Sequence, residues 1–392
     1  MLTVGTAGVP HEIALPDLGT VSTIPLNNTW KNLYYMPHTH VDPRTDELVL
    51  FAFALSSPFL RLGCLNKDGK MRYEMTVPGI SKPTIFHDFA LTENYIVFFL
   101  CPVQFQVSMS HKLFGGVPPT SYDCTENTML GIMRRYPPGV KKVNAPLNED
   151  GEGSELDELT TESIKWIAIK SCYITHIANA YEQDAETLVI YATKTPQYLD
   201  TSYGGAHSNE AALPEHKTSL CRFVVDLEFS EIREHTMLNH VEHPVCRTEF
   251  YGSKNQFVYC LEFIETTARI EDPDVPLYKS VVKIDLNNQN KKHFFFGSNR
   301  FGGEVKFVPK QKIFASDFHR NPDVLKKKQE DDGYLLCFVY DEISESTDLV
   351  VIDAQTMDEA FSLSLPNRVP YGFHTEYVSR EECSRAIPKP WK

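Results

Sequence analysis

Four histidines constrain the fold of this chain more than any other feature. His38, His87, His176 and His374 each stand in a distinctive phrase: PHTHVDPRTDELVLFAF, IFHDFALTENYIVFF, ITHIANAYE and VPYGFHTEY. The intervals between them, 49, 89 and 198 residues, are far longer than the short C-x-x-C or H-x-x-x-H spacings of structural zinc sites. Metal ligands that are scattered over most of a chain indicate a closed, radially repeated fold that brings distant segments to one axis.

Strand-forming residues dominate the rest of the chain. Eight runs are rich in Val, Ile, Phe and Tyr and are bounded by Gly, Pro, Asp or Asn, which is the pattern of β-strands. No long helical periodicity is present, so the pattern indicates an all-β propeller or sandwich rather than alternating strands and helices. The runs are 48–55, 94–100, 187–193, 219–227, 255–263, 278–286, 333–341 and 347–354.

Length and composition bound the possibilities further. A chain of 392 residues can hold two average domains, but all-β folds often run this long as one, so we expect a single domain over residues 1–392. The net charge of −14 argues against nucleic acid as a partner. Nine scattered cysteines without a C-x-x-C pair indicate reduced thiols rather than a disulfide framework.

Targeting signals are not evident in the sequence. The first residues lack a basic stretch followed by an apolar run, and no stretch approaches the eighteen or so apolar residues of a membrane span. We therefore expect a cytoplasmic protein, and no obligate protein partner is evident. Leu113 and Phe114, in the stretch 107–123, suggest a weak peripheral membrane contact, although an ordinary loop between blades is the favoured interpretation. Residues 146–163 and 196–218 have the composition of solvated loops.

Several phrases are recognisable together. HDFALTENY, HIANAYE, EDDG at residues 330–333 and PYGFH occur in this order and resemble the carotenoid cleavage oxygenase family, which includes carotenoid, apocarotenoid and stilbene dioxygenases. The resemblance runs from about residue 1 to residue 376. It implies a seven-bladed β-propeller with one iron(II), Fe(2+), on its axis, held by His38, His87, His176 and His374.

The chemistry of the four residues agrees with that implication. Neutral imidazole suits iron, copper, zinc and nickel, and four imidazoles add no ligand charge to the metal. One alternative stays open from spacing alone, because His40 lies two residues from His38 and would point to the same face of a strand. The family phrase places the ligand four residues before the Asp42-Pro43 pair, which favours His38.

Metal-bound imidazoles need hydrogen-bond acceptors for their second N–H. By resemblance, Glu249 in CRTEFYGSKNQFVY and Glu304 in GGEVKFVP supply two of these acceptors, for His176 and His374 respectively. A third family glutamate precedes the first histidine; here Thr6 stands in its place, which brings no negative charge to support His87.

The resemblance predicts an oxidoreductase. An iron-dependent dioxygenase would use O2 to cleave a carbon–carbon double bond of a lipophilic carotenoid or apocarotenoid, giving two carbonyl products, with no catalytic residue beyond the metal ligands. Family members carry more chain ahead of Thr6, so we expect a propeller incomplete at its N-terminal side and impaired activity. Two alternatives remain: a stilbene-type cleavage dioxygenase, disfavoured by Gly5 where stilbene-cleaving members have lysine, and a non-catalytic propeller scaffold.

Overall fold

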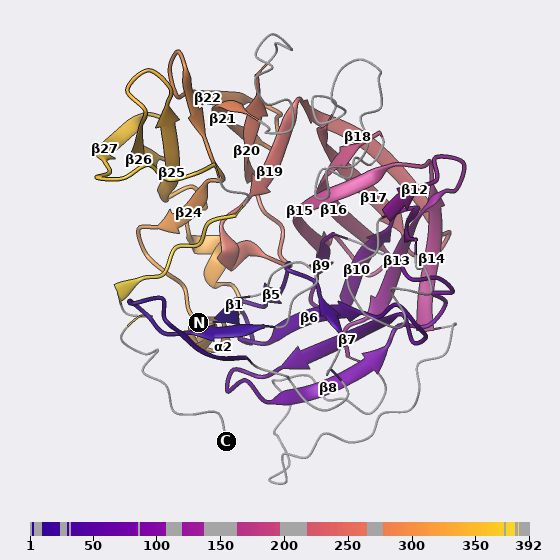
Figure 1. Cartoon of the computed structure of the whole chain (residues 1–392). Coiled ribbons are helices and arrows are strands. Elements are labelled where there is room, and N and C mark those ends of the chain that lie inside the picture. Colours follow the sequence, from indigo (N-terminus) through magenta and orange to yellow (C-terminus); the bar gives the residue numbers. More distant parts are fainter. Residues whose placement is uncertain are drawn as a thin grey trace.

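The computed structural model describes the chain as a set of antiparallel β-sheets. The described residues are 2–3, 10–23, 30, 33–84, 87–106, 120–136, 163–196, 218–264, 277–371, 374–380 and 383. Figure 1 shows the sheets following one another around the molecule in chain order, from indigo at the bottom, through magenta on the right, to orange and yellow at the upper left. This order in space is what a radially repeated fold requires.

Residues up to Asn239 form five of the six sheets found in the described residues. A three-stranded sheet contains β1 (Leu2–Thr3), β2 (His11–Ile13) and β3 (Thr20–Thr23). The next contains β4 (Tyr34–Tyr35), β6 (Leu48–Phe53), β7 (Leu60–Leu65) and β8 (Met71–Thr76), with β5 (His40–Val41) paired to β6. A four-stranded sheet has the order β14 (Ile164–Ile169), β13 (Thr128–Arg134), β10 (Tyr95–Leu100) and β9 (Phe89–Leu91), and β11 (Val103–Phe105) pairs with β12 (Thr120–Tyr122). Another four-stranded sheet contains β15 (Tyr173–Glu182), β16 (Thr187–Thr195), β17 (Ser219–Asp226) and β18 (Glu231–Asn239).

The chain from Val241 onward forms one nine-stranded sheet and the described helices. Its strands are β19 (Val241–Val245), β20 (Phe257–Phe263), β21 (Tyr278–Asp285), β22 (Lys291–Phe295), β23 (Arg300–Gly302), β24 (Lys306–Pro309), β25 (Gly333–Asp341), β26 (Ser346–Asp353) and β27 (Glu359–Ser364). The helices are the short α2 (Ala315–Arg320) and the 3-10 turns η4 (Thr248–Phe250) and η5 (Val324–Lys327).

The all-β class predicted from the strand pattern is confirmed. All eight predicted runs are strands, namely β6, β10, β16, β17, β20, β21, β25 and β26. The number of blades stays a prediction. Most of the expected loops at 107–123, 146–163 and 196–218, with Leu113 and Phe114, lie outside the described residues, apart from β12 and the ends of these stretches.

Apolar cores are shared between neighbouring sheets. On β10, Ile96 and Phe98 pack with the sheet of β6, whereas Val97 and Phe99 pack with the sheet of β15. On β16, Ile190 belongs to the core shared with β10, and Val189 to the core shared with β20. Burial on both faces explains why these strands read as continuous apolar runs instead of alternating ones. The sheets of β10 and β16 are therefore each packed against neighbouring sheets on both faces.

Edge strands of three sheets lie next to one another. β9 and β15 are edge strands of their sheets, β19 begins the nine-stranded sheet, and β15 contacts both β9 and β19. Two of the four predicted ligands lie on or beside these inner strands: His176 is in β15, and His87 precedes β9. Docking of the sheets thus also brings the ligand-bearing segments together.

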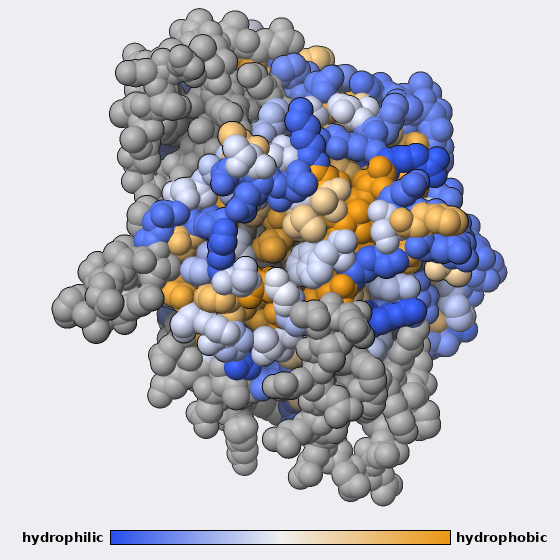
Figure 2. Space-filling model, turned by 90° about the vertical axis from the view of Figure 1, so that its right-hand side faces the viewer, coloured by the Kyte–Doolittle hydropathy of each residue, from blue (hydrophilic) through white to orange (hydrophobic). Residues whose placement is uncertain are grey.

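The surface on the β14 side differs in polarity from place to place. Apolar residues gather in the middle of this face, and hydrophilic residues surround them (Figure 2). Such gathering is a common feature of contact surfaces. No helix among the described residues is long and apolar enough to span a membrane.

Candidate metal centre

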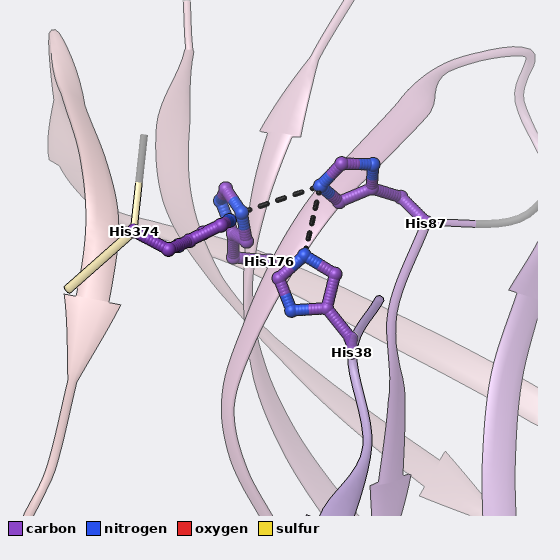
Figure 3. A group of neighbouring side chains, drawn as sticks. All are labelled: His38, His87, His176 and His374. Carbon is purple, nitrogen blue, oxygen red and sulfur yellow. Dashed lines mark hydrogen bonds between the residues drawn. The ribbon is translucent and has the colours of Figure 1, made fainter. Parts of the chain in front are cut away.

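The four predicted ligand histidines converge on one point. His38 Nε2 lies 3.1 Å from His87 Nε2, which lies 3.3 Å from His176 Nε2. The ring of His374 completes the group, with its centroid 4.9 Å from that of His38 and 5.2 Å from that of His176. One nitrogen from each of the four rings lies within 4.8 Å of the other three. Figure 3 shows the four rings pointing toward one another from separate segments.

The spacing of the nitrogens fits a shared metal ion. Two nitrogens bonded at right angles to one metal at ~2.1 Å are about 3.0 Å apart, close to the contacts of His87 Nε2 with both neighbours. A nitrogen in neutral imidazole either donates one hydrogen or offers one lone pair, so a single Nε2 cannot make two ordinary hydrogen bonds of opposite sense. Four imidazoles around one point match the borderline metals that histidine binds.

A β-bulge aims His176 at this point. The pairing of β15 with β16 shifts between Ile174 and Ile177, so Thr175 and His176 leave the regular ladder. The hydroxyl of Thr193 replaces the lost backbone partner: His176 N–H donates to Thr193 Oγ1 (3.1 Å), and the same hydroxyl donates to the His176 carbonyl (3.2 Å). β-bulges often redirect side chains beside active sites. Here the hydroxyl of the buried Thr193 makes the hydrogen bonds that the backbone of His176 loses at the bulge.

Asp88 ties three histidine-bearing segments together. It is 5% exposed, and its Oδ2 accepts a hydrogen bond from the N–H of Ile177, the residue after His176 (2.7 Å). Its Oδ1 lies 2.9 Å from His40 Nε2. The choice between His38 and His40 is therefore clear in geometry, because the His40 ring is paired with Asp88 while the His38 ring joins the cluster.

Glu242, rather than Glu249, supports His176. Glu242 Oε2 lies 2.7 Å from His176 Nδ1, so this nitrogen donates to the carboxylate and leaves Nε2 to face the cluster. Thr175 Oγ1 donates to the other carboxylate oxygen, and Thr193 Oγ1 lies 2.9 Å from that oxygen.

The prediction for Glu249 is wrong. The Glu249 carboxylate pairs with the Arg247 guanidinium (3.3 Å) and accepts the N–H of Ile313 (3.2 Å). Glu249 lies in η4, beyond the end of β19, whereas Glu242 lies within β19 beside the histidines.

Glu304 lies where the sequence predicted it. Its Oε1 is 3.4 Å from His374 Nδ1, and its Oε2 accepts the N–H of Thr375 at 2.7 Å. The carboxylate therefore contacts both the ring and the backbone of the last histidine segment. Thr6, expected near His87, lies outside the described residues.

Burial and neighbouring charges favour neutral histidine rings at the centre of the site and ionised carboxylates around them. Burial lowers the pKa of His87 to about 3 and that of His38 well below its usual range, so both rings keep a free lone pair at neutral pH. Burial also acts to lower the pKa of His176, but the Glu242 carboxylate outweighs it and raises that pKa. Burial acts to raise the pKa of Glu304, yet His374 and Lys306 outweigh it and lower that pKa to about 2. Ionised Glu242 and Glu304 can together balance a divalent cation.

Two residues of the site escaped sequence reasoning. Glu242 and His243 stand in the strand VEHPV, and they are only 6% exposed each. A carboxylate inside an apolar strand is a usable signal, since Glu is almost never fully buried without a partner. His243, by contrast, gives no signal that separates it from an ordinary core histidine.

A matched pair of variants tests the carboxylate assignment. Glu242→Gln is expected to weaken retention of a divalent metal by ~10–100-fold, because the lost charge no longer orients His176. Glu249→Gln changes an equally buried carboxylate seven residues along the chain and is expected to leave metal affinity within about twofold, since it touches no ligand. Chelator competition measures both. Equal losses in the two variants would contradict the assignment.

Comparison with known proteins gives one family. The model of the family described as retinal pigment epithelial membrane protein matches residues 1–379. The carotenoid 9,10(9',10')-cleavage dioxygenase of Crocus sativus is 28% identical over 400 residues, which cover 97% of this chain and 64% of that protein. The 9-cis-epoxycarotenoid dioxygenase NCED6 of Arabidopsis thaliana is 26% identical, covering 99% of this chain and 59% of its own. The chain thus spans less than two thirds of the length of these curated relatives.

Solved structures share the fold. An apocarotenoid oxygenase mutant from Synechocystis superimposes with a TM-score of 0.70 at 21% identity, covering 95% of this chain and 71% of that one. The lignostilbene dioxygenase of Pseudomonas brassicacearum gives a TM-score of 0.73 at 20% identity, with 95% and 72% covered. At this identity the likeness concerns the fold alone.

Proposed function

Because the chain belongs to the retinal pigment epithelial membrane protein family, that of the carotenoid cleavage oxygenases, we propose that it is a non-haem iron dioxygenase that cleaves a carbon–carbon double bond of a conjugated apolar substrate. The observation that carries the proposal is the group of four imidazole nitrogens within 4.8 Å of one another. A family match alone would also fit a propeller that has lost its metal, but such a protein has no reason to keep four ligands on distant segments.

Two sets of residues would have separate roles, one as metal ligands and one as the carboxylates that orient those ligands. His38, His87, His176 and His374 would hold iron(II), and the bound metal supplies the activation of O2 that no protein side chain provides. Glu242 fixes the tautomer of His176 by accepting its Nδ1 hydrogen, and Glu304 lies ready to do the same for His374. Cleavage of a double bond by O2 into two carbonyl compounds moves no proton, so neither a general acid nor a general base is needed.

The substrate we propose is a carotenoid or an apocarotenoid. Support comes from the curated relatives, which are named for carotenoid cleavage. A stilbene is the second candidate, because the fold is equally close to that of a lignostilbene dioxygenase. A cytoplasmic location stays a prediction.

Oxygen labelling tests the reaction itself. The iron-loaded chain is incubated in detergent micelles with a carotenoid, an apocarotenoid or a stilbene under 18O2, and the products are identified by mass spectrometry. We expect two carbonyl products from a polyene, each with one labelled oxygen. Cleavage of the stilbene alone would replace the substrate class. Iron binding without products from any of the three would leave the scaffold as the better account.

A further inference from the structure

A fifth histidine lies against the four. The ring of His243 has its centroid 4.9 Å from that of His176, tilted by 30°, and 5.5 Å from that of His374, at 77°. Tyr278 packs edge-on against its remaining side at 5.5 Å. His243 thus fills the space between two histidines whose segments come from different parts of the chain.

The backbone of β19 is distorted to place this ring. The pairing of β19 with β20 shifts between Glu242 and Val245, and His243 takes a positive φ of 50°. The left-handed region is unfavourable for residues with a Cβ, and it persists only where the surroundings enforce it. Pro244, which has no N–H, fits a bulge because no ladder hydrogen bond is required there. The His243 N–H donates to the Glu242 carboxylate, so the bulge and the acceptor of His176 form one unit.

The polar atoms of the His243 ring lie between the two carboxylate–histidine pairs. One ring nitrogen lies within 4.8 Å of both Glu242 and His176, and one lies within 4.8 Å of both Glu304 and His374. Nδ1 is buried and has no hydrogen-bond partner among the described residues, although the residue is only 6% exposed. A buried imidazole nitrogen without a partner costs about 1–3 kcal/mol, which points to a role at this position.

We propose that His243 is a positioning residue of the metal centre, whose ring packs between the Glu242–His176 and Glu304–His374 pairs and so fixes the mutual orientation of His176 and His374. The inference rests on the proposed metal centre. It adds a fifth imidazole that does not join the group of four nitrogens but braces two of its members from outside. A neutral imidazole suits the task because its one N–H can donate to one of the two carboxylates, which only accept, while the rigid ring packs against the other pair.

The test removes the ring and then restores it. Glycine at position 243 accepts the positive φ without strain, so His243→Gly leaves a ring-sized space on a relaxed backbone. Cobalt(II) serves as the probe, its affinity measured by chelator competition and its geometry by visible absorption. We expect the affinity to fall ~10–100-fold, the usual cost of losing a partner that orients a ligand, and the absorption to change. Free imidazole is expected to restore both, and thiophene, a ring of the same size without N–H, to restore neither.

Controls separate positioning from folding. His243→Asn tolerates the left-handed backbone and keeps a donor and an acceptor, so it is expected to retain most of the affinity. Adding free imidazole to the unchanged chain shows how much imidazole itself, by binding cobalt, alters the measured affinity. Thermal unfolding without metal shows whether the variants fold. Unchanged affinity in His243→Gly, or equal rescue by thiophene, would overturn the inference. Failure of the unchanged chain to bind any cobalt would overturn the four-histidine centre as well, so the two failures are distinguishable.

Discussion

Replacing His87 by alanine is expected to lower iron(II) affinity by more than ~100-fold and to remove double-bond cleavage. Losing only a hydrogen-bond partner of a ligand already costs ~10–100-fold, and His87 is the ring whose Nε2 contacts both His38 (3.1 Å) and His176 (3.3 Å). Its removal would leave the remaining nitrogens without their shared neighbour. Iron content after gel filtration, together with product formation from a polyene, measures the effect.

Two further histidine variants make this prediction specific. His235→Ala changes an exposed histidine on β18 and is expected to alter neither iron content nor cleavage. His40→Ala is expected to reduce both only partly, because His40 acts on Asp88 rather than on the cluster. Full iron content in His87→Ala would contradict the assigned ligand set. So would a complete loss of iron in His40→Ala while His38→Ala keeps its iron.

Replacing Arg135 by methionine is expected to lower the free energy of unfolding by about 3 kcal/mol. Arg135 is 1% exposed at the end of β13 and pairs with Glu47 (2.8 Å) and Asp42, which are also buried. Removing one partner of a buried ion pair costs about 3–5 kcal/mol, and the lower value applies because Arg44 and Arg72 still pair with the two carboxylates.

Urea unfolding of the metal-free chain measures this loss. Arg134→Met is the matched control, since Arg134 is the exposed neighbour whose main contact is the Tyr95 ring at 4.7 Å, and its loss is expected to cost less than about 1 kcal/mol. Similar costs for the two arginines would contradict the assigned role. Asp42 lies four residues after His38, so the network also anchors the segment that carries the first ligand.

The strands were predictable where apolar runs were long. Runs such as 187–193 and 333–341 are long enough for a strand pattern to be distinctive. All eight predicted runs are strands in the structure. Strands of two or three residues, such as β5, β9 and β23, carry too few side chains for any periodicity. Their existence depends on pairing with longer strands such as β6, β10 and β25, and β9, the inner edge strand next to His87, belongs to this short class.

The candidate site was only partly predictable for a related reason. His38, His87, His176 and His374 were found through the phrases around them, and the structure brings them together. Glu249 was assigned from the resemblance of the phrase around it, and a phrase does not reveal which of two nearby carboxylates points inward. The bulge between Glu242 and Val245 decides that, and it depends on the pairing of β19 with β20. The same bulge places His243, which no local pattern marks.

The origin of the ligands on separate sheets has a thermodynamic consequence. His38 follows β4, His87 precedes β9, His176 lies in β15 and His374 follows β27, so the four-ligand set exists only in the folded chain. A metal that binds the folded state alone shifts the folding equilibrium by mass action, by about 2.7 kcal/mol when its free concentration is 100 times the dissociation constant. The ion would thus act as a reversible cross-link between segments up to 336 residues apart, from 38 to 374. Substitutions in the shared cores, far from any histidine, then lower metal occupancy whenever they loosen the docking of one sheet on the next.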